Sequence, residues 1–182
     1  MSKLLSLFLL ISFSPILIIV AIAIILNSGF PILFKQKRVG QNNAYFWIYK
    51  FRTMKRNTPD IATHLLKDST SFYTSIGLFL RKFSLDELPQ LFNILKGDMS
   101  FIGPRPALHN QDDLIKLRTQ VGVHLLMPGL TGWAQVNGRD ELSIKKKVKM
   151  DEYYFKNRSL LLDIKILFMT AFKVFKMDGV SH

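Results

Sequence analysis

The pattern of hydrophobic and polar residues changes its period along the chain. Residues 4–26 carry no charge, and such a run is long enough to cross a hydrocarbon core of about 30 Å as a helix. Between residues 31 and 54, two runs that favour strands flank Gly40-Gln41-Asn42-Asn43, which predicts a β-hairpin. Further on, hydrophobic residues recur at helical spacing, which predicts helices within four ranges: 72–83, 86–96, 107–126 and 141–178.

Glycine, proline and polar residues predict where these elements stop. Gly97 should end the helix over 86–96. The polar stretch 57–70 is expected to be a loop with a short helix. The stretch "MPGLTGWAQVNGR" contains four turn residues and is expected to be a structured loop. The pattern therefore divides the chain into a membrane segment at 1–28 and one compact unit at 29–182.

The apolar segment admits three interpretations. A cleaved signal peptide is one, because Ala21-Ile22-Ala23 resembles a cleavage site, but the apolar run continues beyond it. A simple span and a re-entrant helix are the others. Ser14 and Pro15 lie near its centre, where proline removes a hydrogen-bond donor and a serine hydroxyl can satisfy the freed carbonyl. The cations of "KQKR" at 35–38 place the C-terminal side of the segment in the cytoplasm.

Composition restricts the chemistry. The 182 residues carry a net charge of +12, which favours nucleic acid, an anionic membrane or phosphorylated ligands as partners. Because there is no cysteine, disulfides, zinc thiolates and a thiol nucleophile are excluded. The four histidines are scattered without the spacing of metal ligands, so a histidine-based metal site is not expected.

The basic tail at 141–178 has a large hydrophobic face. Two interpretations of this helical region stay open: an interfacial helix that lies on a membrane, or a core helix with a solvated basic face. The hydrophobic positions alternate with lysines and are Leu160, Leu161, Ile164, Leu167, Phe168, Phe172 and Phe175.

Two adjacent carboxylates, Asp86 and Glu87, open the stretch "SLDELPQLFNILKGDMSFIGPRP". Ser84 and Glu87 match a capping box, and acids in the first turn of a helix interact favourably with its dipole. Pro89 favours a helix that starts near Asp86, because proline is tolerated in a first turn. An ionised carboxylate at that point is a cap, and it is also a usable nucleophile. The local pattern alone favours capping.

Arg105 lies between Pro104 and Pro106, which restrict its backbone. A guanidinium held in this way suits a fixed phosphate site, because it binds two oxygens at once. A surface polyproline spacer is the alternative. Further cations at Lys50, Arg52, Arg81 and Arg139 would suit a phosphoanhydride substrate, which also requires a divalent metal.

The order of "YKFRTM", "SLDELPQLFNILKGDMSFIGPRP", "PGLTGWAQVNGR" and "DEYY" resembles the bacterial sugar transferases, the small monotopic phosphoglycosyl transferases that act on polyprenol phosphate. The resemblance covers most of the chain. It implies a mainly α fold with a small β-hairpin (α+β), an N-terminal re-entrant helix broken at Ser14-Pro15, and interfacial amphipathic helices. It also implies a location at the cytoplasmic face of the inner membrane, in contact with anionic lipids.

The same resemblance implies an activity. A sugar 1-phosphate would move from a UDP-sugar to undecaprenyl phosphate, with release of UMP, in the first membrane step of surface glycan synthesis, such as lipopolysaccharide or capsule. Asp86 would attack phosphorus and form a covalent phosphosugar, and Glu87 would contact Mg²⁺ or accept a proton. The implied substrate and phosphate ligands are Lys50, Arg81, Arg105, Arg139 and Asp151.

Two other classes are weighed against this one. A membrane-anchored nucleic-acid binder fits the charge, but the sequence has no stacking or groove-reading pattern, so no nucleic-acid partner is expected. A catalytically inactive scaffold of a glycan assembly complex is disfavoured by the intact Asp86-Glu87 pair and by Arg105. The sequence fixes neither the sugar and glycan pathway nor the oligomeric state.

Overall fold

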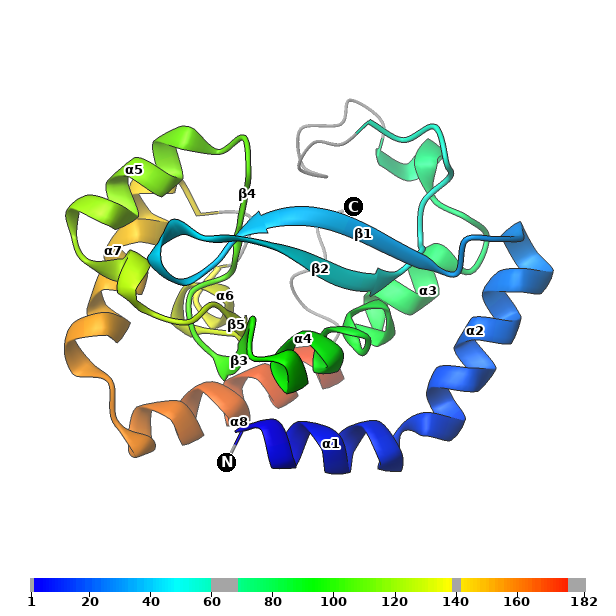
Figure 1. The fold of residues 1–182 in the computed structure, drawn as a ribbon, viewed down its shortest axis with the longest axis horizontal. Helices are drawn as coiled ribbons and strands as arrows, with labels where there is room; N and C mark the ends of the chain where they lie inside the picture. The colour runs from blue at the N-terminus through cyan, green and yellow to red at the C-terminus, as the bar shows by residue number, and fades with distance from the viewer. Residues whose placement is uncertain (1, 60–68, 139–141, 177–182) are drawn as a thin grey trace.

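The computed structural model describes residues 2–59, 69–138 and 142–176. The described chain is mainly helical with two small sheets, so the predicted α+β class is confirmed (Figure 1). One sheet has the strand order β2 (Tyr45–Phe51), β1 (Leu33–Val39), β4 (Ala107–Leu108), and the other pairs β3 (Ser100–Ile102) with β5 (Gly129–Thr131). The prediction of a single hairpin missed this second sheet.

The N-terminal apolar segment forms two helices, α1 (Ser2–Ser12) and α2 (Ser14–Ser28), bent by 61°. The break lies where Ser14-Pro15 predicted it. Pro15 cannot donate to the Ile11 carbonyl, and the Ser14 hydroxyl donates to that carbonyl instead, at 2.7 Å. In the described part of the chain, no helix alone is long and apolar enough to cross a membrane, whereas the bent pair satisfies that test together.

The hairpin is confirmed. Strands β1 (Leu33–Val39) and β2 (Tyr45–Phe51) pair antiparallel, with Leu33 opposite Phe51 and Val39 opposite Tyr45. The turn contains a 3-10 segment, η1 (Gln41–Asn43), in which Asn42 and Asn43 have positive φ. Asparagine tolerates this left-handed conformation, which explains why it occurs in the turn.

The middle of the chain is broken into shorter pieces than predicted. A 3-10 segment, η3 (Ser69–Phe72), precedes helix α3, which covers only Gly77–Lys82 rather than 72–83. The predicted helix over 86–96 is divided into η4 (Leu85–Glu87) and α4 (Gln90–Lys96). Gly97 ends α4 with φ of 97°, as predicted. Most of the predicted loop, residues 60–68, lies outside the described residues.

The stretch "MPGLTGWAQVNGR" contains more regular structure than predicted. Strand β5 (Gly129–Thr131) pairs parallel with β3 (Ser100–Ile102), and helix α6 (Trp133–Val136) follows. The backbone at Gly103 lies close to the backbone of residues 127–129. Glycine is required there, because a Cβ on Gly103 would lie 2.3 Å from the Met127 carbonyl oxygen. The absence of a side chain at Gly103 therefore allows these two backbone segments to pack against each other.

The second half of the described chain contains three more helices besides α6. Strand β4 (Ala107–Leu108) pairs with β1, and α5 (Asp112–Gln120) leads through a 3-10 turn, η5 (Val123–Leu125), to β5. The predicted tail helix is two helices, α7 (Ile144–Asn157) and α8 (Leu160–Lys176). In α8 Ile166 is fully buried, so this helix contributes to the core.

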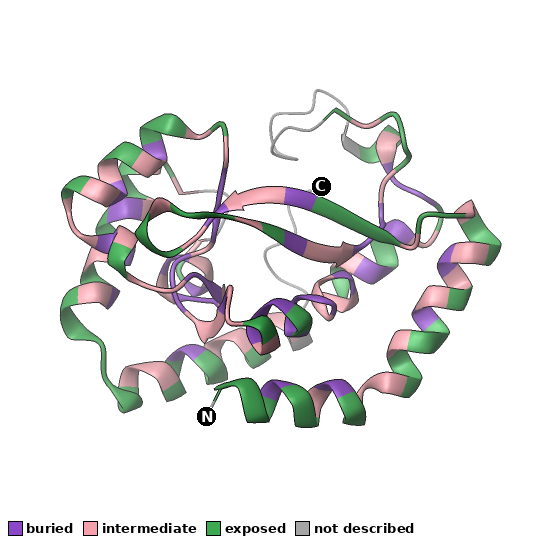
Figure 2. Cartoon of the chain, viewed as in Figure 1, coloured by how far each residue is buried: buried purple, intermediate pink, exposed green. Residues whose placement is uncertain are grey.

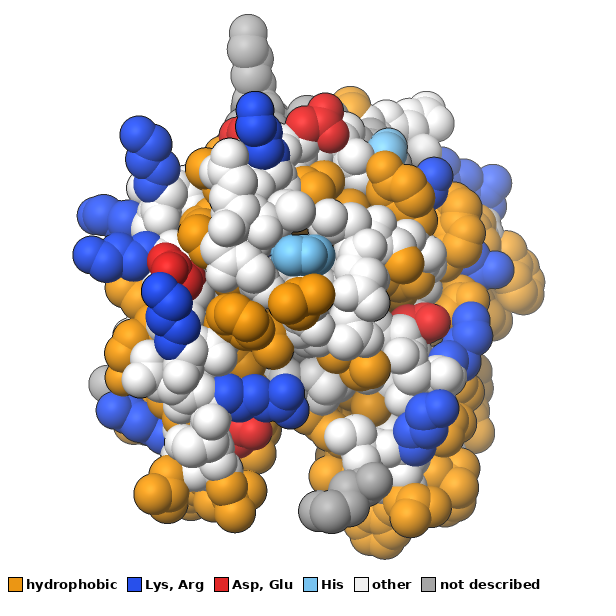
Figure 3. Space-filling view, turned by 60° about the vertical axis from the view of Figure 1, so that its left-hand side comes forward, with side chains coloured by type: hydrophobic (Ala, Val, Ile, Leu, Met, Phe, Trp, Pro, Cys, Tyr) orange, Lys and Arg blue, Asp and Glu red, His pale blue; other side chains and the backbone are white. Residues whose placement is uncertain are grey.

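A hydrophobic surface nevertheless extends over the outer sides of α1, α2 and α8. The exposed residues of α8 include Leu160, Leu161 and Phe168, each at least 75% exposed. Figure 2 shows exposed positions along all three helices. Hydrophobic side chains gather along the lower edge of the molecule in Figure 3, where α1 and α8 lie in Figure 1. The other exposed hydrophobic residues of these helices include Leu4, Phe8, Ile11, Ile18, Ile19, Ile22, Leu26 and Phe172.

Candidate active site

The adjacent carboxylates lie in the 3-10 turn η4, between α3 and α4. Ser84 precedes this turn with φ of 54° and makes no capping hydrogen bond through its side chain. The capping-box interpretation is therefore wrong. Pro89 stands at the start of α4, where its missing donor is harmless, as predicted. Asp86 is 5% exposed, and Glu87 presents a carboxylate oxygen to two cations.

Lys50 and Arg105 converge on that oxygen. The Lys50 Nζ atom donates to Glu87 Oε1 at 2.7 Å, and the Arg105 Nη2 atom donates to the same oxygen at 3.2 Å. Lys50 comes from β2 and Arg105 from the turn between β3 and β4. The structure thus brings together four of the residues that the sequence singled out: Asp86, Glu87, Lys50 and Arg105.

The surroundings alter the pKa of Lys50. Burial lowers it from 10.5 to about 8, an effect that the Glu87 carboxylate opposes and the Arg105 guanidinium reinforces. Asp86 and Arg38 also influence this pKa, so both charges lie close to the Lys50 amine. A lysine with such a pKa loses its charge just above neutral pH.

Arg38 is a residue of this site that sequence reasoning assigned elsewhere, as a cation flanking the membrane segment. Its Nε and Nη2 atoms donate to Gln36 Oε1, at 3.0 and 2.5 Å, and its Nη1 atom donates to the Pro106 carbonyl at 3.0 Å. The two-residue period of a strand could have found it. Gln36, Arg38 and Lys50 occupy alternate positions that share one face of the β1–β2 hairpin.

Asp151 lies apart from the carboxylate pair. It is 1% exposed on α7, and its Oδ2 atom accepts from Arg118 Nε at 3.0 Å and from Nη2 at 2.6 Å. Burial raises the Asp151 pKa, and the Arg118 charge counteracts that rise. Sequence reasoning did not identify Arg118. A substrate-binding role of Asp151 stays a prediction, since its observed contact is with Arg118.

The remaining predicted cations are Arg81, Arg139 and Arg52. Arg81 hydrogen-bonds the Tyr73 hydroxyl, and its guanidinium lies 5.2 Å from the centre of that ring. Arg139 lies outside the described residues. Arg52 is not with the carboxylates: its Nη2 atom donates to the carbonyls of Ser28 and Gly29 at the end of α2, at 2.8 and 2.6 Å. Arg52 thereby fastens the N-terminal helices to the hairpin.

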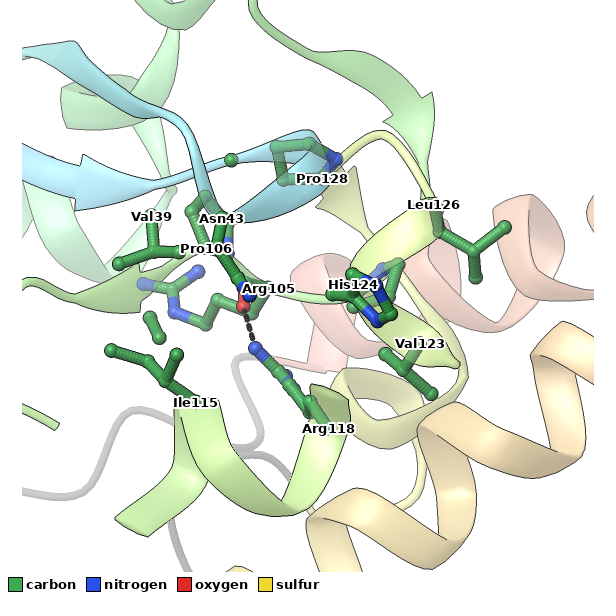
Figure 4. Close-up of a pocket in the computed structure, with 13 residues that line it drawn as sticks. Val39, Asn43, Arg105, Pro106, Ile115, Arg118, Val123, His124, Leu126 and Pro128 are labelled. Atoms are coloured by element: carbon green, nitrogen blue, oxygen red, sulfur yellow. Dashed lines mark hydrogen bonds between the residues drawn. The ribbon is translucent and has the colours of Figure 1, made fainter. Parts of the chain in front are cut away.

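A small pocket adjoins this site at the hairpin turn (Figure 4). It is lined by the turn, by residues 104–107, by α5 and by η5. The Arg105 carbonyl faces the Arg118 guanidinium here, whereas the Arg105 guanidinium reaches Glu87. The turn between β3 and β4 therefore separates the ion pair at Glu87 from the buried ion pair at Asp151.

The family model for bacterial sugar transferases matches residues 1–177. The chain is 44% identical to an uncharacterized sugar transferase, EpsL, of Bacillus subtilis, over 93% of this chain and 83% of that protein. The chain belongs to the bacterial sugar transferase family. This sugar transferase is also 41% identical to the undecaprenyl-phosphate glucose phosphotransferase of Komagataeibacter xylinus, over 91% of this chain and 33% of that protein.

A third relative is the UDP-glucose:undecaprenyl-phosphate glucose-1-phosphate transferase of Escherichia coli, 40% identical over 89% of this chain. The sugar transferase described here spans only about a third of these two named relatives, 33% and 36% of their lengths.

Asp86 and Glu87 are carboxylates of this site that a metal ion would contact. Among the described residues, no group of three or more His, Asp or Glu side chains could hold a metal ion. Magnesium, however, is commonly bound by one or two carboxylates together with substrate phosphates. Asp86 and Glu87 are two adjacent carboxylates beside two cations, and this set of ligands fits a magnesium ion that also binds a diphosphate.

Proposed function

We propose that this sugar transferase moves a sugar 1-phosphate from a UDP-sugar to a polyprenol phosphate, undecaprenyl phosphate, and releases UMP. The observation that carries the proposal is the convergence of Lys50 and Arg105 on Glu87 beside the buried Asp86. The names of the relatives include transferases of glucose, galactose and N-acetylgalactosamine phosphates, so they support the reaction class without selecting one sugar.

In the proposed first step, an Asp86 carboxylate oxygen attacks the phosphorus that bears the sugar. The bond from that phosphorus to the bridging anhydride oxygen breaks, and UMP leaves with the electron pair. In the second step, a phosphate oxygen of the polyprenol phosphate attacks the same phosphorus and releases the Asp86 carboxylate. A covalent intermediate of this kind allows a soluble donor and a lipid acceptor to react in turn.

The neighbouring side chains have distinct tasks in this scheme. Lys50 and Arg105 bind the diphosphate oxygens, since charge-assisted hydrogen bonds to phosphate are strong and Arg can bind two oxygens at once. Glu87 would hold Mg²⁺, which supplies charge neutralisation at the phosphates when bound. Glu87 could alternatively accept the proton of the incoming polyprenol phosphate.

The proposal includes a membrane location at the cytoplasmic face of the inner membrane. The bent pair α1–α2 would enter the bilayer as a re-entrant element, and the exposed hydrophobic side of α8 would lie in the interface. The net charge of +12 would add attraction to anionic lipids. This arrangement would keep the carboxylates near the headgroup level, where both substrates are accessible.

The covalent step can be tested without the lipid acceptor. The protein, a panel of UDP-sugars and Mg²⁺ should give a UMP burst of at most about one equivalent with the correct donor. The protein should gain the mass of one phosphosugar on the peptide that contains Asp86. Polyprenol phosphate should then restore turnover, with parallel double-reciprocal lines.

Two results would contradict this scheme. Intersecting lines, with no UMP before the lipid is added, would indicate direct transfer in a ternary complex. No UMP with any donor, even with lipid present, would favour an inactive scaffold of a glycan assembly complex. Asp86→Asn is the matched control, because it removes the charged nucleophile while keeping the size of the side chain.

A further inference from the structure

Three successive carbonyls of the turn that carries Arg105 are each held by a donor from a different element. The Pro104 carbonyl accepts from the Gly129 N–H at 2.9 Å. The Arg105 carbonyl accepts from Arg118 Nη1 at 2.8 Å, and the Pro106 carbonyl accepts from Arg38 Nη1 at 3.0 Å. These donors come from β5, α5 and β1, so the turn is fixed by segments that are distant in sequence.

Carbonyl groups are the main means of fixing this turn. Pro104 and Pro106 have no N–H to donate, and their rings already set φ at two positions. What remains is the orientation of the peptide plane between Arg105 and Pro106. The Arg118 hydrogen bond sets that plane directly, and Figure 4 shows the contact reaching across the pocket.

Arg118 is itself held rigidly. Its Nε and Nη2 atoms bind Asp151, and its Nη1 atom binds the Arg105 carbonyl, so all three nitrogen atoms of the guanidinium contact the protein. The side chains of Arg118 and Asp151 are 10% and 2% exposed. A chain of contacts therefore runs from Asp151 on α7, through Arg118 on α5, to the backbone of Arg105. The guanidinium of Arg105 in turn binds Glu87.

We propose that Arg118, fixed by Asp151, is a positioning residue that sets where the Arg105 guanidinium meets the phosphates of the donor. This inference rests on the proposed function, because it assumes that Arg105 binds a diphosphate. Arg118 acts through Arg105 and does not touch the ligand. Its contribution to anion binding should therefore disappear when the Arg105 guanidinium is removed.

Calorimetric titration of inorganic pyrophosphate into the full chain in detergent tests this dependence through a double-mutant cycle. Arg118→Lys, which lacks the rigid fork of donors that spans Asp151 and the carbonyl, should weaken pyrophosphate binding about tenfold, a loss that slight misplacement of a binding group can cause. In an Arg105→Ala background, Arg118→Lys should change binding by less than about twofold. Arg118→Lys should lower the midpoint temperature of thermal unfolding equally in both backgrounds.

Two further variants separate positioning from general support of the fold. Arg52→Lys alters another buried arginine that holds carbonyls, away from the site, and should leave the pyrophosphate affinity within about twofold. Asp151→Asn keeps the size and one acceptor oxygen, so it serves if Arg118→Lys does not fold. It should give a smaller loss that again requires Arg105.

Equal losses in the two Arg105 backgrounds would overturn the inference, because Arg118 would then act on the anion or on the fold independently of Arg105. Failure of the parent protein to bind pyrophosphate is a different result. It would refute the phosphate site of the proposed function, and the positioning role with it.

Discussion

Two carboxylates in this fold pair with arginine in opposite surroundings. Glu87 shares one oxygen between Lys50 and Arg105, and the Arg105 side chain is 28% exposed. Asp151 pairs with Arg118 alone, and that pair is almost completely enclosed. We expect that an anionic ligand can replace Glu87 as the partner of the partly exposed Arg105, and that the enclosed pair at Asp151 is less accessible to a ligand. We therefore expect the same pairing to serve chemistry in one place and architecture in the other.

The largest expected effect separates chemistry from stability at the cluster of Asp86, Glu87, Lys50 and Arg105. Asp86→Asn should lower turnover by roughly 10⁴-fold or more, as removal of a nucleophile does in other covalent enzymes. The protein should stay folded, because asparagine has nearly the same size and shape. UMP release and thermal unfolding measure the two effects. Turnover near that of the parent would eliminate Asp86 as the nucleophile.

The second effect compares the two carboxylates directly. Asp151→Ala leaves the Arg118 charge buried and unpaired, so the free energy of unfolding should fall by about 3–5 kcal/mol. Glu87→Ala should cost less, because the buried Lys50 can lose its proton and the partly exposed Arg105 can be hydrated or bind buffer anions. Denaturant unfolding of both variants checks the difference. Similar losses would mean that the two clusters have the same structural role.

Local signals explain which parts of this molecule the sequence could predict. The break at Ser14-Pro15, the hairpin turn at 40–43 and the stop at Gly97 each depend on residues within one or two turns, and all three are confirmed. The parallel pairing of β3 and β5 depends on contacts between residues about thirty positions apart. No local pattern encodes such a pairing, which is why the prediction gave a loop there.

The candidate site divides in the same way. Asp86, Glu87, Lys50 and Arg105 were found through motifs whose chemistry is visible in the side chains themselves. Arg118 was missed because its function comes from a partner 33 residues away and from a carbonyl, and neither leaves a signature near Arg118. Arg38 could have been found, since alternation along β1 places it on the face of Lys50.

The third effect follows from the Lys50 pKa of about 8. Lys50 is protonated below that pH, and its proposed role in anion binding requires the charge. Pyrophosphate affinity should therefore fall as pH rises through about 8, by up to about tenfold per pH unit. Calorimetry between pH 7 and 9.5 measures it, and Lys50→Arg should abolish the fall. A pH-independent affinity in the parent would show that Lys50 does not bind the anion.

The free energy of unfolding, in contrast, should rise with pH between about pH 8 and 10.5, because of the same group. The unfolded chain holds the Lys50 proton more tightly, since the ordinary pKa is 10.5 and the folded value is about 8. Below about pH 8, burial of the charged amine therefore lowers the free energy of unfolding by its full amount. This loss of stability disappears as pH rises toward 10.5. Comparison with Lys50→Met isolates the contribution of Lys50.

The smallest effect concerns Glu87 as a competitor for its own cations. In this structure Glu87 Oε1 accepts hydrogen bonds from both Lys50 and Arg105, the two residues proposed to bind the diphosphate. Glu87→Gln keeps the size of the side chain but removes the charge, so the cations should bind pyrophosphate about fivefold more tightly, the equivalent of roughly 1 kcal/mol for a partly exposed ion pair. Turnover should still fall, because the same carboxylate is proposed to hold Mg²⁺ or to accept a proton.

The titration is best done without Mg²⁺, so that loss of a metal ligand cannot mask the gain in anion affinity. Glu152→Gln on α7 serves as the control for the loss of one negative charge. Unchanged or weaker binding by Glu87→Gln would show that Glu87 organises Lys50 and Arg105 for the anion and does not compete with it.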